Sequence, residues 1–310
     1  MIGVCIVTYN QEKYIAQAID SVLMQVDCGH RVVAYVGNDC STDKTGEICH
    51  QYADNFPGSI IVVDNSSNLG LVGNTMNLLD IMRKDGCNYI AMLDGDDYWC
   101  DDHKLQKQMD YMHNHPEYGL VHTCVDLLYP HKLIKDKRQS AQEGDVSAII
   151  SNYRIGNCSV VFKTNLLDLI DFEDFQQQGL MSVDYMMYLI FSFYTSFGFL
   201  SDHTAVWRRG HDSVSNTNDI EKQIRYIQND LAAWKYAAKL FPEKFEANEK
   251  ALNEYLHYKS FMIAFKYGDR KRALKESKLM GGSFRKMNRL KILVTYSVVL
   301  STLWRWYKKI

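Results

Sequence analysis

Short apolar runs alternate with segments of helical periodicity through the first third of the chain, and this alternation limits the folds available to it. The apolar runs lie at residues 2–7, 31–36, 59–63 and 89–93. The helical segments lie at about residues 11–26, 41–55 and 71–84. A continuous apolar run is typical of a strand buried on both faces, as in a parallel sheet. The alternation therefore predicts an α/β fold with a mostly parallel, Rossmann-like sheet covered by helices on both faces.

Polar residues follow each of these strands, and a parallel sheet brings them to the same edge, where ligands bind in open α/β folds. The residues concerned are Thr8, Tyr9 and Asn10, then Asn38 and Asp39, then Asp94, Gly95, Asp96 and Asp97. An aromatic ring and several carboxylates therefore meet at this edge. Carboxylates placed so close together repel one another unless they bind a cation. The sequence thus predicts a ligand site at this edge.

Asp94 and Asp96 form a D-x-D pattern at the end of the fourth strand. Carboxylate oxygens suit a hard divalent cation such as Mg²⁺ or Mn²⁺, and such an ion usually completes its shell with water and substrate phosphates. A diphosphate is therefore the partner that this pattern favours. The alternative is an ordinary acidic turn after a strand.

The rest of the chain continues the α/β pattern and then becomes helical. We expect helices at residues 104–113 and 183–194, and strands at 118–126, 158–162 and 199–208. Residues 131–150 are polar and give no assignment, and the helical pattern begins at residue 220. The predicted organisation is an α/β domain at 1–218, whose first half, to about residue 100, carries the ligand edge and whose second half lies at 101–218. A helical extension at 219–310 follows it.

Four motifs in this chain occur in a recognisable order. They are VCIVTYN at residues 4–10, NDCSTD at 38–43, NLG at 68–70 with Asn74, and LDGDDYW at 93–99 with Lys104 and Leu105 behind it. Their order and spacing resemble those of the family 2 glycosyltransferases, over about residues 1–215. The resemblance implies the GT-A fold, a nucleotide-diphosphate sugar as donor, and sugar transfer with inversion at the anomeric carbon.

The same resemblance assigns roles at the nucleotide. Tyr9 would stack on the base, usually uracil, and Asp39 would accept a hydrogen bond from a base N–H, while Thr8 and Asn10 shape the pocket. Asp94 and Gly95 would also contact the nucleotide. A carboxylate suits this task because it only accepts hydrogen bonds. The alternatives are an ordinary aromatic residue at a strand end for Tyr9 and a helix cap for Asp39.

For the metal, the resemblance implies Asp96 as a ligand, with Asp94 or Asp97 binding the ion directly or through water. These carboxylates would hold Mn²⁺ or Mg²⁺ against the diphosphate. Asp184 matches the catalytic aspartate that removes the proton of the acceptor hydroxyl. The family often has Glu before this aspartate, whereas Val183 stands here. The alternative is that Asp184 caps the following helix.

The segment WRRGHDSVS at residues 207–215 is similar to the family's Tyr-Arg-x-His-x-x-Ser loop near the diphosphate. Trp207 replaces the tyrosine, and His211 lies one place later than usual. The resemblance offers Arg208 and Arg209 as phosphate contacts through their forked donors. His211 is offered as a metal ligand or a phosphate contact. Solvated loop arginines are the alternative.

Charge divides the chain into an acidic body and a basic tail. Residues 1–258 carry 21 basic and 35 acidic side chains, whereas residues 259–310 carry 14 and 2. The acidic body argues against nucleic acid as a partner. The uncharged stretch at 292–304 has 13 residues, about 20 Å as a helix, too short for a bilayer core of about 30 Å. With Trp304 at its end and Trp306 and Tyr307 after it, the tail suits an anionic membrane surface; packing on protein is the alternative.

No charged segment precedes the first apolar run, and the eight cysteines form no C-x-x-C pair. We therefore expect reduced thiols in a cytoplasmic protein, with the tail on the inner face of the membrane if it docks there. The expected function is metal-dependent, inverting transfer from a nucleotide-sugar, a UDP-sugar first, to a saccharide or lipid-linked saccharide. The alternative is a non-catalytic nucleotide-sugar-binding or scaffold subunit. A nucleotidyltransferase or Rossmann dehydrogenase is disfavoured because no glycine-rich loop follows the first strand.

Overall fold

The chain divides into two compact units in a computed structural model, Met1–His211 and Asp212–Ile310. The structure describes residues 1–135, 155–177, 183–209, 220–242, 249–282 and 285. Among these residues, the first unit contains a nine-stranded sheet of order β3-β2-β1-β4-β8-β6-β9-β5, with β7 paired to β6. The boundary predicted at residue 218 lies outside the described residues.

The first half of the sheet is parallel, as the apolar runs predict. Its strands are β3 (Ile60–Asp64), β2 (Val32–Asn38), β1 (Ile2–Thr8) and β4 (Tyr89–Asp94). Thr8 pairs with Asn38 in register, and Val7 pairs with Asp94. The last residues of the three central strands therefore lie level at one edge of the sheet.

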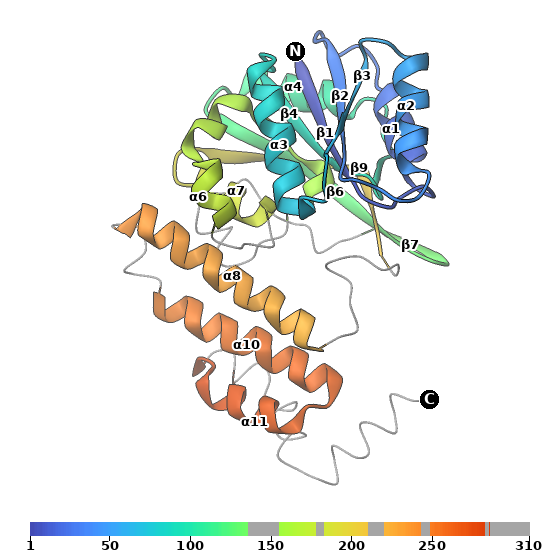
Figure 1. The fold of residues 1–310 in the computed structure, drawn as a ribbon. Coiled ribbons are helices and arrows are strands. Elements are labelled where there is room, and N and C mark those ends of the chain that lie inside the picture. The colour runs from blue at the N-terminus through green and yellow to red at the C-terminus, as the bar shows by residue number, and fades with distance from the viewer. Residues whose placement is uncertain (136–154, 178–182, 210–219, 243–248, 283–284, 286–310) are drawn as a thin grey trace. The chain divides into compact units, whose positions relative to one another are not determined.

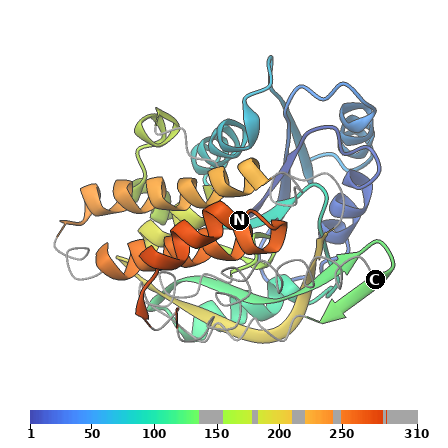
Figure 2. The same ribbon diagram turned by 90° about the horizontal axis from the view of Figure 1, so that it is seen from below.

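The second half of the sheet is mixed. Its strands are β8 (Val161–Lys163), β6 (Tyr118–Tyr129), β9 (Ser196–Arg208), β5 (Tyr98–Trp99) and β7 (Lys132–Lys135). β8 runs antiparallel to both β4 and β6, whereas the long strands β6 and β9 run parallel, side by side (Figure 2). Apolar runs show that a strand is buried but not which way it runs. The change to antiparallel pairing at β8 was therefore not predicted from the sequence.

Helices cover both faces of the sheet (Figure 1). On one face α1 (Ile15–Leu23), α2 (Thr45–Asn55) and α4 (Lys104–Asn114) share a core with Ile2, Val4 and Ile6. On the other face lie α3 (Gly70–Lys84), α6 (Phe172–Gln177) and α7 (Val183–Phe191). Gly37 allows α3 to approach, because a Cβ there would lie 2.8 Å from the Leu78 side chain. Both faces are covered, as predicted.

The second unit is helical, as the sequence indicates. It contains α8 (Ile220–Leu240), α10 (Glu249–Tyr267) and α11 (Arg270–Leu279), with α10 beside both of the others (Figure 1). Its described core comprises Phe261, Ala264, Ala273 and Met280. No helix in the described part of the chain is long and apolar enough to cross a membrane. Of the segment predicted to dock, residues 283–310, only residue 285 is described, so that prediction lies outside the described residues.

The side chain of Lys104, a charged residue, is buried in the core of the first unit. Lys104 is 0% exposed, its Nζ donates to Gln108 Oε1 at 2.5 Å, and it lies 4.4 Å from the centre of the Trp99 ring. Burial lowers the pKa of Lys104 to about 7. Lys104 therefore opposes folding wherever the unfolded chain would carry its charge.

We expect Lys104→Met to stabilise the protein by an amount on the order of 2 kcal/mol at pH 7, because it removes a buried charge. The loss of the hydrogen bond to Gln108 offsets part of this gain. The unfolded lysine has a pKa of 10.5 and the folded one about 7, so the stability of the unmodified protein falls between those values as pH decreases. The advantage of the variant should shrink as pH rises towards 10. Urea unfolding at several pH values measures it.

The matched control is Lys107→Met. Lys107 pairs with Asp101 at 2.7 Å and with Asp202 at 2.8 Å, and it is partly exposed. This variant should destabilise the protein by less than about 1 kcal/mol, because solvent screens such pairs. Equal effects from the two substitutions would contradict the buried-charge account of Lys104.

Candidate active site

The ends of β1, β2 and β4 form the floor of the site. Gly95 N donates to Val7 O at 2.9 Å, and Asp39 N donates to Thr8 O at 3.0 Å, so the loops after these strands are joined to their neighbours. Tyr9 is 47% exposed at this edge, directly after a buried Thr8. The predicted convergence of these three segments is what the structure shows.

Asn10 connects the first loop to the second. Its backbone has φ 52°, in the left-handed region that asparagine tolerates. Its Oδ1 accepts from Thr42 N at 2.8 Å, and its backbone N–H donates to Ser41 Oγ at 3.1 Å. Asn10 thus fixes the loop that presents the Tyr9 ring.

Asp39 is held by a network of asparagines. Its carboxylate is 2% exposed, and Oδ1 accepts from Asn65 Nδ2 at 2.9 Å and from Leu69 N at 2.8 Å. Asn65 also donates to Asn74 Oδ1 at 2.9 Å, and its own Oδ1 accepts from Asn77 at 2.9 Å. No hydrogen bond from a described residue reaches Oδ2 of Asp39. One oxygen is therefore fixed and the other remains able to accept from a ligand.

Asp96 and Asp184 both act electrostatically on Asp94. Burial and then the negative charge of Asp96 raise the pKa of Asp94 to about 7, and the charge of Asp184 adds to this, while a hydrogen bond from Asn157 opposes it. Asp184 lies in the first turn of α7, far along the chain from β4. The fold has thus brought the predicted base close to the predicted metal site.

Asp97 lies deeper than its neighbours in the acidic turn. It is 2% exposed, and its Oδ1 accepts from Arg208 N at 2.9 Å. Burial, followed by the charges of Asp96 and Asp94, raises the pKa of Asp97 well above its ordinary value. In this structure Asp97 joins the acidic turn to the end of β9.

The two arginines predicted as phosphate contacts lie against aromatic rings. The Arg208 guanidinium is 5.0 Å from the centre of the Tyr14 ring and 4.9 Å from that of Tyr98, and it donates to Gln17. Arg209 lies 4.3 Å from the centre of the Trp207 ring. The Nε atoms of both arginines are buried without a hydrogen-bond partner among the described residues. His211 lies outside the described residues.

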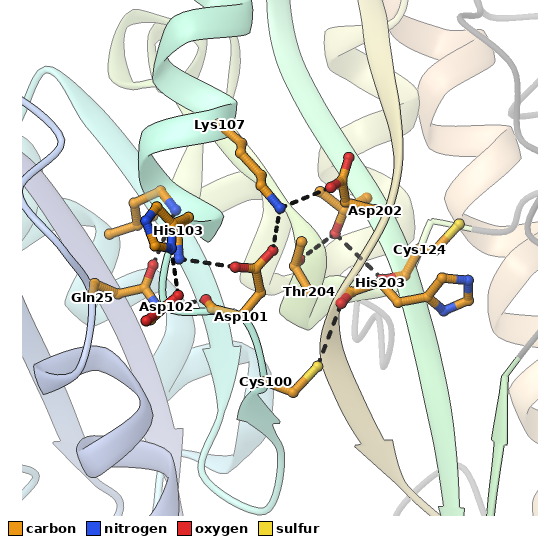
Figure 3. A network of polar contacts seen from close by, with 12 residues as sticks. Gln25, Cys100, Asp101, Asp102, His103, Lys107, Cys124, Asp202, His203 and Thr204 are labelled. Atoms are coloured by element: carbon orange, nitrogen blue, oxygen red, sulfur yellow. Dashed lines mark hydrogen bonds and ion pairs between the residues drawn. The ribbon is translucent and has the colours of Figure 1, made fainter.

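A second acidic group, outside the predicted site, has the tighter geometry for a metal. Asp101, Asp102 and His103 form the one described set of three such side chains whose ligand atoms all lie within 4.8 Å of one another. Figure 3 shows that Lys107 already bridges Asp101 and Asp202, and Asp102 contacts His103 Nδ1 at 2.5 Å. Lys107 already neutralises part of this negative charge, and Asp102 is already paired with His103. The acidic turn at Asp94 and Asp96 therefore remains the better candidate, since Mg²⁺ and Mn²⁺ need only one or two carboxylates beside substrate phosphates.

Four residues of the site were not predicted from the sequence. Asn65 and Asn77 support Asp39, while Asn157 donates to Asp94 and Tyr188 donates to Asn157. Each is a single polar residue in a loop or on an apolar helix, so no pattern marked it. Asn74 belongs to a motif of the family, but its contact with Asn65 was not predicted.

A family model described as Glycosyl transferase family 2 matches residues 3–170. The chain belongs to this family. TuaG of Bacillus subtilis, a putative teichuronic acid biosynthesis glycosyltransferase, is 35% identical over 112 residues, which is 36% of this chain and 42% of TuaG. Uncharacterised proteins of Mycobacterium tuberculosis and Mycobacterium bovis are 34% identical over 123 residues, 40% of this chain. The chain spans about a third of the length of these mycobacterial relatives, 34%.

Two solved structures resemble nearly the whole chain. S. aureus TarS 1–349 in complex with UDP-GlcNAc has a TM-score of 0.58 and 15% identity, covering 98% of this chain and 91% of that one. The mannosyltransferase PcManGT from Pyrobaculum calidifontis, in complex with GDP-Man and Mn²⁺, has a TM-score of 0.60 and 16% identity, covering 97% and 82%. At these identities the likeness shows the fold. The family and the GT-A fold predicted from the sequence are confirmed.

We expect the Asp94→Asn variant to be more stable than the unmodified protein at pH 8, by an amount on the order of 2 kcal/mol. This is less than the whole pKa shift of Asp94 implies, because water still reaches this carboxylate. The folded pKa of about 7 exceeds the unfolded value of 3.8, so the unmodified protein loses stability as pH rises between them. Below about pH 4 the two proteins should be equally stable. Denaturant unfolding across this range provides the measurement.

Asp101→Asn is the matched control with the opposite sign. Burial alone would raise the pKa of Asp101, but hydrogen bonds from Lys107 and from His103 N hold it below its ordinary value. This variant should lose stability at neutral pH, and the loss should disappear as pH falls through the lowered pKa of Asp101. A destabilised Asp94→Asn at pH 8 would show that the three carboxylates do not repel one another.

Proposed function

We propose that this chain is an inverting, metal-dependent glycosyltransferase that uses a nucleotide-diphosphate sugar, with a UDP-sugar as preferred donor. The acceptor is a saccharide or a lipid-linked saccharide in cell-envelope glycan synthesis. The observation that carries the proposal is the link between α7, which carries Asp184, and Asp94 at the edge that holds Tyr9 and Asp39: Tyr188 of α7 is hydrogen-bonded through Asn157 to Asp94, and the charge of Asp184 acts on Asp94. A base pocket, an acidic turn and a proton acceptor are the three parts that such a transfer requires.

At the nucleotide, the free oxygen of Asp39 would accept the N–H of the base while Tyr9 stacks on its ring. The asparagine network supports this role, because it fixes one oxygen of Asp39 and orients the other. Tyr9 is exposed enough to offer a face to a ligand. Thr8 and Asn10 hold the loop that carries Tyr9. Gly95 allows the acidic turn to lie close to Thr8, because a Cβ at residue 95 would lie 2.9 Å from the Thr8 side chain.

The acidic turn fits a hard divalent cation. Asp94 and Asp96 offer carboxylate oxygens. Burial and then the charge of Asp96 raise the pKa of Asp94, and a bound cation would favour its charged form, which supports the assignment. We assign Asp96 and Asp94 to Mn²⁺ or Mg²⁺, with Asp97 behind them. The chemistry that such an ion supplies when bound is neutralisation of the charge that develops on the departing diphosphate. Arg208, Arg209 and His211 stay in the proposal as candidate contacts of the diphosphate or the metal.

Asp184 is the proposed general base. It would accept the proton of the acceptor hydroxyl as that oxygen attacks the anomeric carbon from the side opposite the nucleotide, which inverts the configuration. Its position at the start of α7 would otherwise serve as a helix cap. Its electrostatic effect on Asp94 favours a place in the site.

The donor and acceptor classes rest on relatives. TarS was crystallised with UDP-GlcNAc, PcManGT with GDP-Man, and the name of TuaG refers to teichuronic acid synthesis. The basic tail would bring the enzyme to an anionic membrane surface, where lipid-linked acceptors lie. The scaffold alternative predicts nucleotide binding without transfer.

Calorimetric titration with UDP, GDP, CDP and NAD, each with Mn²⁺ or with chelator, tests the donor site. We expect UDP to bind most tightly and at least tenfold more weakly without Mn²⁺. Asp39→Asn should weaken UDP binding at least tenfold, because the amide can present a donor where the base needs an acceptor. The control is Asp64→Asn, an exposed aspartate at the end of the neighbouring strand β3, which should leave binding unchanged. Metal-independent binding, or none, would overturn the proposed site.

Asp184→Asn tests the base. Transfer should fall by about 10²–10⁴-fold while UDP binding stays the same, because the amide cannot accept the proton. Asp171→Asn is the matched control, since Asp171 accepts from Glu173 N and Asp174 N at 3.0 Å and so acts as a helix cap. If Asp184→Asn loses as little activity as Asp171→Asn, then Asp184 is a cap and not the base.

A further inference from the structure

A partly buried hydrogen-bond chain links the helix of the proposed base to the proposed metal site. The Tyr188 hydroxyl donates to Asn157 Oδ1 at 2.8 Å, and Asn157 Nδ2 donates to Asp94 Oδ1 at 3.2 Å and to Oδ2 at 3.3 Å. Tyr188 lies one helical turn after Asp184 on α7, and its side chain is 0% exposed. Asn157 begins a short 3₁₀ turn, residues Asn157–Ser159, before β8.

The chemistry of the groups sets the direction of this chain. A carboxylate only accepts, so the amide must turn its NH₂ group towards Asp94. The amide oxygen then faces Tyr188, whose hydroxyl donates to it. A reversed amide would place two acceptors against each other at Asp94 and would strand the phenol donor inside the protein. Tyr188 therefore fixes which end of Asn157 meets the carboxylate.

We propose that Asn157 and Tyr188 are positioning residues that hold the Asp94 carboxylate in its metal-binding orientation and tie that orientation to α7. This inference rests on the proposed function, because it takes Asp94 as a metal ligand and Asp184 as the base. Groups that orient a ligand commonly change metal affinity by 10- to 100-fold when removed. Tyr188 acts through Asn157, and Asn157 acts through the Asp94 carboxylate.

The substitutions separate this role from packing. Tyr188→Phe removes one oxygen atom and keeps the ring, whose centre lies 6.4 Å from that of Phe191. Asn157→Ala removes the amide. Tyr35→Phe is the matched control, because Tyr35 is also buried and its hydroxyl donates to Asp85 at 3.0 Å, away from the acidic turn.

The measurement is the Mn²⁺ concentration that half-saturates UDP binding, obtained by calorimetry on the full chain. We expect it to rise about tenfold in Tyr188→Phe and at least tenfold in Asn157→Ala, with no change in Tyr35→Phe. UDP binding in the presence of chelator should stay at the level of the unmodified protein, because the base pocket is separate. The double variant should be no worse than Asn157→Ala alone, since Tyr188 has nothing to orient once the amide is absent.

Two results would overturn the inference alone. One is a Tyr188→Phe variant that needs no more Mn²⁺ than Tyr35→Phe. The other is a double variant whose loss is the product of the two single losses, which would mean that the residues act independently. If the unmodified protein shows no metal-dependent UDP binding, the proposed function fails and this inference fails with it. Thermal unfolding of each variant verifies that it is folded.

Discussion

The parallel register of β1, β2 and β4 is the constraint on which the rest of the site depends. Since Thr8 pairs with Asn38 and Val7 pairs with Asp94, the three loops that follow begin at the same edge of the sheet. A shift of one residue in any strand would turn its last side chain to the other face. Tyr9, Asp39 and Asp96 follow strand ends at one edge of the sheet because backbone hydrogen bonds hold these strands level.

Electrostatic repulsion is the cost of this arrangement. Burial disfavours the charged form of Asp94 most strongly, and the charges of Asp96 and Asp184 add to this effect and raise the pKa of Asp94. Elsewhere the chain balances its buried or close carboxylates, as Lys107 does for Asp101. We therefore interpret the acidic cluster at Asp101 as structural and the one at Asp94 as the proposed ligand site. Binding sites commonly retain such unfavourable charge, at the expense of stability.

The fold could be predicted largely from the sequence, because apolar runs and helical periodicity report burial directly. Strand direction in the second half could not, because β8 and β6 look alike whether they run parallel or antiparallel. The motifs named Asp39, Asp94 and Asp96 as members of one site, and the register explains why. They gave no sign of Asn65 or Tyr188, because a single buried polar residue follows no pattern. The surroundings of Arg208, stacked between Tyr14 and Tyr98, were equally hidden, since they depend on pairing between β5 and β9.

The central claim is that the edge formed by β1, β2 and β4 binds a nucleotide diphosphate through a metal ion at the acidic turn. Anomalous diffraction from crystals grown with UDP and Mn²⁺ tests it most directly, because the metal is then located independently of any assay. We expect an anomalous peak between the carboxylates of Asp94 and Asp96 on one side and the diphosphate on the other. We also expect the uracil to lie at Tyr9 and Asp39. A peak at Asp101, Asp102 and His103, or a nucleotide bound elsewhere on the chain, would contradict it.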